Sequence, residues 1–125
     1  MPINPARRLW WTVFLTYAAA VCVVSVIPVV QVGPRIPSFD KLLHLIEYAL
    51  FGWFLARAQL ASGSPWPHVA RTAVIGAAVY GAVLELVQAM LPYRDAEWLD
   101  AVTNAVGGIV GIQLIPARLR NLSRG

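Results

Sequence analysis

Long hydrophobic stretches separated by short polar segments make up most of the chain. A helix needs about 20 residues, at ~1.5 Å of rise each, to cross the hydrocarbon core of a bilayer. Four stretches are long enough, and they run from Leu9 to Val30, Leu42 to Ala61, Val69 to Leu91 and Leu99 to Ala117. The pattern predicts an all-α integral membrane bundle of four transmembrane helices, with residues 1–125 forming one domain.

Composition agrees with this prediction. Of the 125 residues, 58% are hydrophobic and 13% are charged, and the mean hydropathy is +0.63, which is unlike a soluble domain. The first stretch follows Arg7 and Arg8, as a signal-peptide core would, but it is longer than such a core and no small-x-small cleavage site follows it. We therefore expect a retained helix. The single Cys22 excludes an internal disulfide and is expected to be a packing residue.

The basic residues predict the orientation of the bundle, because cytoplasmic loops of membrane proteins carry more Lys and Arg. With the N-terminus inside, three basic residues face outward: Arg35, Lys41 and Arg94. Seven face the cytoplasm: Arg7, Arg8, Arg57, Arg71, Arg118, Arg120 and Arg124. This favours a bacterial-type cytoplasmic (inner) membrane protein with both termini in the cytoplasm. The net charge of +4 then reflects topology and contact with membrane lipids, and no nucleic-acid partner is expected.

All acidic residues fall in two short windows. One holds Asp40 and Glu47, and the other holds Glu85, Asp95, Glu97 and Asp100. In the predicted orientation both windows lie at the outer ends of helices. Burying a charge in a membrane is costly, so intramembrane ionisable residues are candidates for function.

Helical spacing predicts that these polar residues form three stripes that meet at one depth. The stripes are Asp40, His44, Glu47 and Tyr48; Glu85 and Gln88; and Asp100 and Asn104. Arg94 follows in the last outer loop, where it could neutralise Asp100 or Glu85. Asp95 and Glu97 are expected to cap the fourth helix and to face water. We therefore predict a polar pocket that faces the extracytoplasmic side.

The loops differ in what they predict. The outer loop Gln31 to Phe39 contains Gly33, Pro34 and Pro37, which indicates a stiff, non-helical segment. The inner loop Ser62 to His68 is expected to be an ordinary turn with an interfacial Trp66 and a solvated His68, and we assign it no chemistry.

The polar residues carry a resemblance to a known family. The features are Asp40-Lys41-x-x-His44-x-x-x-Tyr48 opening a helix, Glu85-x-x-Gln88, Arg94, and Asp100-x-x-x-Asn104-x-x-Gly107 with Gly111. In this order and spacing, from about Pro37 to Ile115, the chain resembles the VanZ-like family of small membrane proteins. The resemblance implies the fold and topology. The family takes its name from a protein that lowers susceptibility to a glycopeptide antibiotic acting outside the membrane, so it also suggests a contribution to antibiotic resistance.

The first functional hypothesis is a pocket for a cell-envelope or lipid-linked ligand. Lys41 and Arg94 could hold a phosphate or carboxylate, while His44 could transfer a proton, oriented by Asp40 or Glu47. The candidate catalytic residues are His44, Glu85, Asp40 and Asp100, and the candidate ligand-binding residues are Lys41, Glu47, Tyr48, Gln88, Arg94 and Asn104. No serine or cysteine lies on these faces, which disfavours acyl transfer of the serine hydrolase kind. Whether the protein is an enzyme stays open.

Three alternatives stand beside this hypothesis. A metal could be held by His44, Glu47, Glu85 and Asp100, although one histidine is a thin ligand set, and the residues identify no cofactor. The polar groups could simply hold the helices together by hydrogen bonds. The protein could also be a non-enzymatic scaffold or homo-oligomer that associates through Gly107 and Gly111 or through the stretch from Ala18 to Cys22.

Overall fold

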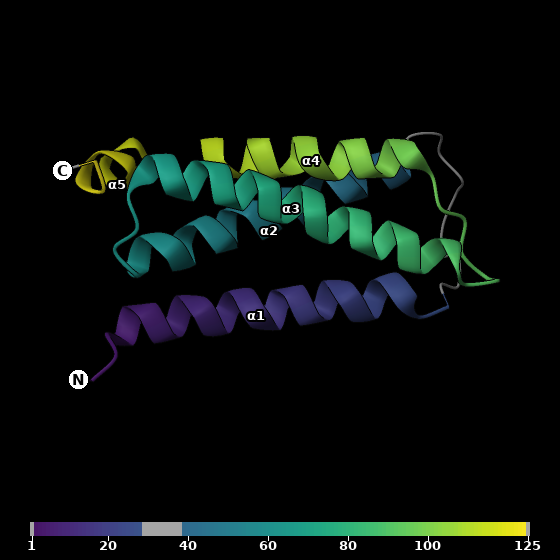
Figure 1. Cartoon of the computed structure of the whole chain (residues 1–125), viewed down its shortest axis with the longest axis horizontal. Coiled ribbons are helices and arrows are strands. Elements are labelled where there is room, and N and C mark those ends of the chain that lie inside the picture. The colour runs from purple at the N-terminus through teal and green to yellow at the C-terminus, as the bar shows by residue number, and fades with distance from the viewer. Residues whose placement is uncertain (1, 29–38, 125) are drawn as a thin grey trace.

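Four long helices lie along the long axis of the molecule, and a short fifth helix lies at one end (Figure 1). The structure, a computed structural model, describes residues 2–28 and 39–124. The helices are α1 (Pro5–Val26), α2 (Phe39–Ala61), α3 (Trp66–Ala89), α4 (Trp98–Gln113) and α5 (Ala117–Leu122). The predicted all-α fold with four main helices is therefore confirmed. The prediction for the outer loop falls on residues 31–38, which lie outside the described residues.

The helix boundaries follow local sequence signals. The side chain of Asn4 accepts a hydrogen bond from the amide of Ala6 at 2.9 Å and caps α1. Prolines precede α3 and α5, at Pro65 and Pro116, where a missing amide proton does no harm. Gly63 takes a φ of +83° in the turn between α2 and α3, a conformation that favours glycine.

The inner loop and the fourth stretch differ from prediction. α3 already begins at Trp66, so Trp66 is a buried helical residue and not a loop residue, and it lies beneath the guanidinium of Arg120 at 5.1 Å. His68 is exposed, as predicted, but belongs to α3. α4 ends at Gln113 because Pro116 cannot continue the helix, and a separate helix, α5, begins at Ala117.

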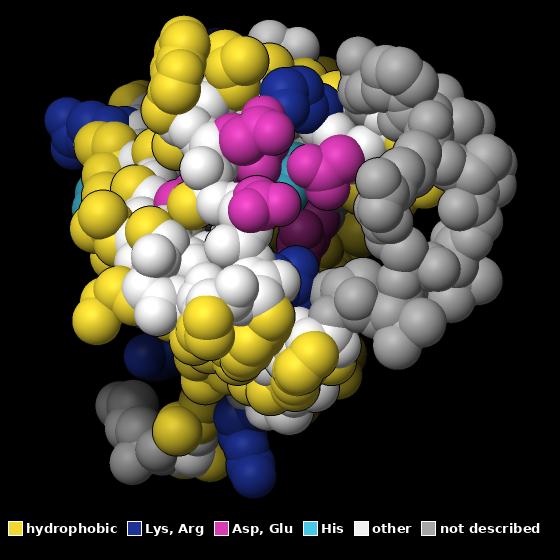
Figure 2. All heavy atoms as spheres, turned by 90° about the vertical axis from the view of Figure 1, so that its right-hand side faces the viewer, with side chains coloured by type: hydrophobic (Ala, Val, Ile, Leu, Met, Phe, Trp, Pro, Cys, Tyr) yellow, Lys and Arg dark blue, Asp and Glu magenta, His cyan; other side chains and the backbone are white. Residues whose placement is uncertain are grey.

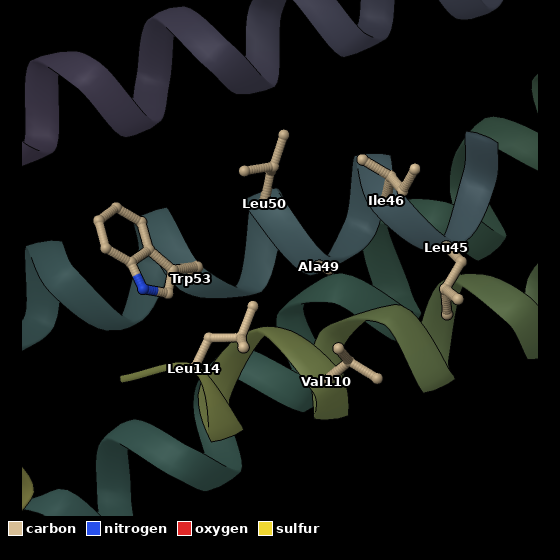
Figure 3. Close-up of a pocket in the computed structure, with 7 residues that line it drawn as sticks. All are labelled: Leu45, Ile46, Ala49, Leu50, Trp53, Val110 and Leu114. Atoms are coloured by element: carbon tan, nitrogen blue, oxygen red, sulfur yellow. The ribbon is translucent and has the colours of Figure 1, made fainter. Parts of the chain in front are cut away.

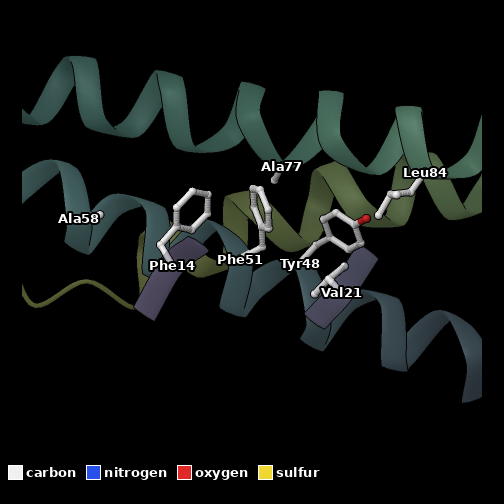
Figure 4. Packing of buried hydrophobic residues seen from close by; sticks show 7 residues of the cluster. All are labelled: Phe14, Val21, Tyr48, Phe51, Ala58, Ala77 and Leu84. Atoms are coloured by element: carbon white, nitrogen blue, oxygen red, sulfur yellow. The ribbon is translucent and has the colours of Figure 1, made fainter. Parts of the chain in front are cut away.

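Aromatic side chains fill the middle of the bundle (Figure 4). The ring of Phe51 lies 5.1 Å from that of Phe14 and 4.8 Å from that of Tyr80. Tyr48 joins this cluster, and Cys22 packs against it, so the predicted packing role of Cys22 is confirmed. A second cluster around Trp66, Val69 and Ile115 fills the end near α5.

Glycines bring α4 directly against α2. A Cβ atom on Gly107 would lie 2.8 Å from the carbonyl oxygen of Leu45, and one on Gly111 would overlap the carbonyl oxygen of Ala49. Only residues without a side chain permit such close backbone contact. The expectation that Gly107 and Gly111 mediate self-association is therefore wrong, because α2 of the same chain occupies their faces.

Large hydrophobic side chains are exposed on the outside of all four long helices. Examples, one for each helix, are Leu15, Leu50, Val79 and Val106, each at least 42% exposed. Among the described residues, α1 and α3 are long and apolar enough to cross a membrane. Polar residues such as His44, Glu47 and Arg57 lower the hydropathy of α2, and α4 has only 16 residues.

Candidate functional site

All six acidic residues gather at one end of the bundle, which we call the acidic end. It comprises the beginning of α2, the last turns of α3, the link from α3 to α4, and the beginning of α4. Figure 2 faces this end and shows acidic side chains beside a histidine. The residues are Asp40, Glu47, Glu85, Asp95, Glu97 and Asp100. The predicted stripes therefore lie at a common end of the molecule.

His44 lies at the centre of the carboxylates. Its Nε2 is 3.8 Å from Oδ1 of Asp40 and 3.7 Å from Oδ2 of Asp100, and its Nδ1 is 4.0 Å from Oε2 of Glu47. These distances are too long for hydrogen bonds but short enough for electrostatic attraction once His44 is protonated. α2 and α4, the two helices in closest contact, supply all four side chains.

Lys41 joins α2 to the link before α4. Its Nζ donates to Oε2 of Glu97 at 2.8 Å and lies 3.5 Å from Oδ1 of Asp100. The hydrogen bond from Lys41 lowers the pKa of Glu97, a residue of the exposed link. Glu97 stands at the first position before α4, but its side chain makes no capping bond there. The expected capping role of Glu97 is therefore wrong, because its carboxylate is paired with Lys41.

Glu85, Asn104 and Asp100 are buried among the helices. Glu85 belongs to the predicted inward stripe of α3, which is indeed the buried face of that helix. Asn104 is 1% exposed and fits against Gly81, where a Cβ atom would lie 2.7 Å from Nδ2 of Asn104. Four buried atoms of this end have no hydrogen-bond partner among the described residues: His44 Nδ1, Glu85 Oε2, Arg94 Nε and Asn104 Oδ1.

Two candidate ligand-binding residues are engaged with α1 instead. Nη2 of Arg94 donates to the carbonyl oxygens of Val24 and Ile27 at 2.6 and 2.8 Å. Nε2 of Gln88 donates to the carbonyl of Ser25 at 3.0 Å. Arg94 forms no ion pair with Asp100 or Glu85 in the described part of the chain, contrary to expectation. Both side chains satisfy carbonyl groups at the end of α1, which have no partner within the helix.

Tyr48 and Glu47 mark the inner limit of the acidic end. Tyr48 is 2% exposed and packs with Phe51 and Val21 in the aromatic cluster (Figure 4), so it lies beneath the carboxylates. The main-chain carbonyl of Glu47 accepts a hydrogen bond from the hydroxyl of Tyr17 at 2.6 Å. The polar stripe of α2 thus passes directly into the core.

A metal would find a different ligand set from the one predicted. Asp40, His44 and Asp100 each offer an atom within 4.8 Å of the others. Glu47 and Glu85 are not part of that group. Two carboxylates and one imidazole suit several divalent cations, but the ammonium of Lys41 already lies beside Asp100.

An apolar groove runs between α2 and α4, starting next to the acidic end (Figure 3). It has a volume of about 410 Å³ and is lined by Leu45, Ile46, Ala49, Leu50, Trp53, Val110 and Leu114. Leu45 directly follows His44 in the chain. The sequence gives no signal for this groove, because it depends on how closely two helices approach.

Comparisons with known proteins give one match. No curated protein matches the chain, and no solved structure does either. The apolar helices and the family together indicate a membrane protein. The chain matches the VanZ/LLP1 family over residues 4–120 and therefore belongs to that family.

Proposed function

We propose that the chain spans the bacterial cytoplasmic membrane four times, with both termini in the cytoplasm, and that its acidic end binds a cell-envelope or lipid-linked ligand at the outer surface. The hydrophobic exterior of all four long helices supports four spans. Both termini lie at the same end of the bundle (Figure 1), opposite the acidic residues. The arginine-rich end would face the cytoplasm.

The observation that carries this proposal is the unused hydrogen-bonding capacity at the acidic end. Four atoms are buried and unpartnered among the described residues: His44 Nδ1, Glu85 Oε2, Arg94 Nε and Asn104 Oδ1. Buried polar groups in folded proteins nearly always have partners. A cluster that only held helices together would satisfy these atoms internally, whereas a binding site leaves them for a ligand.

The geometry favours a ligand that donates hydrogen bonds. Nζ of Lys41 and Nη2 of Arg94, the basic groups expected to hold a phosphate, are engaged with Glu97 and with α1 carbonyls, while Nε of Arg94 is buried and has no partner among the described residues. Carboxylate and amide oxygens remain, and these accept bonds from hydroxyl or ammonium groups. The groove between α2 and α4 is suited to a hydrocarbon chain attached to such a group. Hydroxylated or amine-bearing lipid-linked precursors of the envelope fit this description.

Native mass spectrometry of the protein purified from its membrane tests this proposal. The wild type should retain an envelope-lipid mass that His44→Ala and Glu85→Gln lose. His68→Ala is the matched control, because His68 is exposed at the opposite end. Equal retention by all four proteins, or no retained mass in a folded wild type, would contradict a ligand site at the acidic end.

A role in glycopeptide resistance belongs to the same proposal. Glycopeptide antibiotics act outside the membrane, on the side that the acidic end would face. Cells that produce the wild type should then tolerate more antibiotic than cells that produce His44→Ala at the same level. Equal tolerance would separate ligand binding from resistance.

Metal binding is a second candidate function, favoured by the proximity of Asp40, His44 and Asp100. A divalent cation would have to compete with Lys41 for Asp100. Elemental analysis of the purified protein, before and after incubation with zinc or manganese, tests this candidate. Stoichiometric metal that is lost in Asp40→Asn would support it.

A further inference from the structure

The end of the bundle opposite the acidic residues is strongly basic. It comprises the beginning of α1, the end of α2, the beginning of α3, and α5 (Figure 1). Its arginines are Arg7, Arg8, Arg57, Arg71, Arg118, Arg120 and Arg124. No Asp or Glu side chain belongs to these segments. Any counter-ion for these arginines must therefore come largely from outside the chain.

Arg57 differs from the other arginines of this end because aromatic rings hold its side chain while its Nε has no hydrogen-bond acceptor among the described residues. Its guanidinium lies over the ring of Trp10 at 4.4 Å and near that of Trp53 at 5.6 Å. Its Nε is buried and has no hydrogen-bond partner in the described segments. Arg120, by contrast, donates to the carbonyls of Ile115 and Gln113 at 2.8 and 2.5 Å. A buried donor without an acceptor is costly unless a ligand supplies one.

Arg57 also lines a pocket. The pocket has a volume of about 410 Å³ and lies between the beginning of α1, the end of α2, and α5. Its wall combines the polar Arg57 and Ser123 with the apolar Leu119 and Leu122. Leu122 is 79% exposed at the rim. A pocket with a cation on one side and exposed apolar groups on the other suits an amphipathic anion.

We infer that this pocket binds the phosphate of an anionic phospholipid. The guanidinium of Arg57 would donate charge-assisted bonds to phosphate oxygens, which match its planar donor geometry. Leu119 and Leu122 would contact the beginning of the acyl chains. A net negative headgroup is favoured over a zwitterionic one because this end carries no acidic side chain of its own. The site is separate from the acidic end and does not depend on the function proposed there.

The test is native mass spectrometry of the detergent-purified protein with equal amounts of phosphatidylglycerol and phosphatidylcholine of the same chain length. The wild type should retain phosphatidylglycerol in preference. Arg57→Gln should weaken retention by about tenfold or more, as expected for loss of a charge-assisted bond. Arg71→Gln is the matched control, since it removes an exposed arginine from the same end and should retain the lipid.

A second pair of variants covers the case in which Arg57→Gln does not fold. Leu122→Glu places a carboxylate at the exposed rim beside Arg57 and should exclude the lipid. Asn121→Glu adds the same charge to α5 at an exposed position that does not line the pocket, and it should bind like the wild type. The inference would be overturned if the two variants of either pair lost equal amounts of bound phosphatidylglycerol. It would also be overturned if the wild type retained both lipids equally. Displacement of the lipid by millimolar inorganic phosphate would overturn it too, because the site would then take a free anion.

Discussion

Arg94 donates a hydrogen bond to the main-chain carbonyl of Val24, 70 positions earlier in the chain, at 2.6 Å. The same nitrogen reaches the carbonyl of Ile27, and the hydroxyl of Tyr93 reaches that of Val26 at 2.6 Å. The link between α3 and α4 thus binds the end of α1. A residue that spacing assigned to ligand binding is the chief contact between the outer link and the first helix.

Arg94→Lys should loosen α1, because the shorter lysine side chain does not bring its nitrogen as far as Nη2 of Arg94, the one nitrogen that donates to both carbonyls. We expect a loss of about 1 kcal/mol in the free energy of unfolding. Cys22 of α1 is the only cysteine and packs against the core, so its rate of maleimide labelling in detergent reports the change. Labelling should accelerate in Arg94→Lys and stay at the wild-type rate in Arg71→Lys. Unchanged labelling of Arg94→Lys would show that α1 is held without this contact.

Gly111→Ala should destabilise the bundle. Its new Cβ atom would overlap backbone, the carbonyl of Ala49, and backbone cannot move aside without shifting α4. Overpacking of this kind costs about 1 to 3 kcal/mol. Gly76→Ala is the control, since its Cβ atom would meet only the tip of the Leu55 side chain at 2.8 Å, which can rotate away. Thermal unfolding in detergent should show a clear drop for Gly111→Ala and little change for Gly76→Ala; equal drops would contradict the proposed backbone contact.

The ion pair between Lys41 and Glu97 should make stability depend on pH in a defined direction. The folded-state pKa of Glu97 lies below its ordinary value of 4.5, so the pair stabilises the protein above that value and the contribution fades as the pH falls through the lowered pKa. Because Glu97 is exposed and Lys41 is partly exposed to solvent, the effect is small.

We expect Glu97→Gln to unfold at a slightly lower temperature than the wild type at pH 7, and we expect this difference to shrink as the pH falls below 4.5. Asp95→Asn, an exposed acid with no ion pair to the described residues, should match the wild type throughout. A difference between Glu97→Gln and wild type that grows in acid would have the wrong sign and refute this reading of the pair.

Thr72→Val tests a buried polar contact between α2 and α3 that could not be predicted from the sequence. The hydroxyl of Thr72 lies within hydrogen-bond distance of Oε1 of Gln59, a residue only 7% exposed, and also of the carbonyl oxygen of His68 in its own helix at 2.8 Å. Valine has the same shape but leaves that oxygen unpaired, which should cost about 1 to 3 kcal/mol. Thr103→Val is the control, since the hydroxyl of Thr103 bonds only to the carbonyl of Leu99 in its own helix. Denaturation midpoints that fall equally in the two variants would argue against a special role for Gln59.

The faces of the helices could be predicted from the sequence, whereas their partners could not. Spacing placed Glu85 and Gln88 on the buried side of α3, and Asp100 and Asn104 on that of α4, because periodicity within one helix determines which side chains share a face. Contacts between helices depend on rotation and depth, which no single helix encodes. For that reason the sequence indicated neither the bond from Arg94 to α1 nor the groove beside Ala49.

The break before α5 was missed for a related reason. Val110 to Ala117 reads as an uninterrupted apolar stretch except for Gln113 and Pro116, and hydropathy alone extends the helix through it. Proline ends the helix, and Arg120 then folds back onto the freed carbonyls of Gln113 and Ile115. Local backbone chemistry thus overrides the average apolarity of the segment.

Close backbone contact through Gly107 and Gly111 holds α4 directly against α2. His44 and Asp100 belong to these two helices, so we expect their separation to change little when other parts of the bundle move. α1, which contains no glycine, is attached differently, through packed side chains such as Phe14 and Val21 and through single side-chain hydrogen bonds from residues such as Tyr80 and Gln88. We therefore expect α1 to separate from the other helices more easily than α2 separates from α4. Lipid would then enter beside α1, while His44 stays next to its carboxylates.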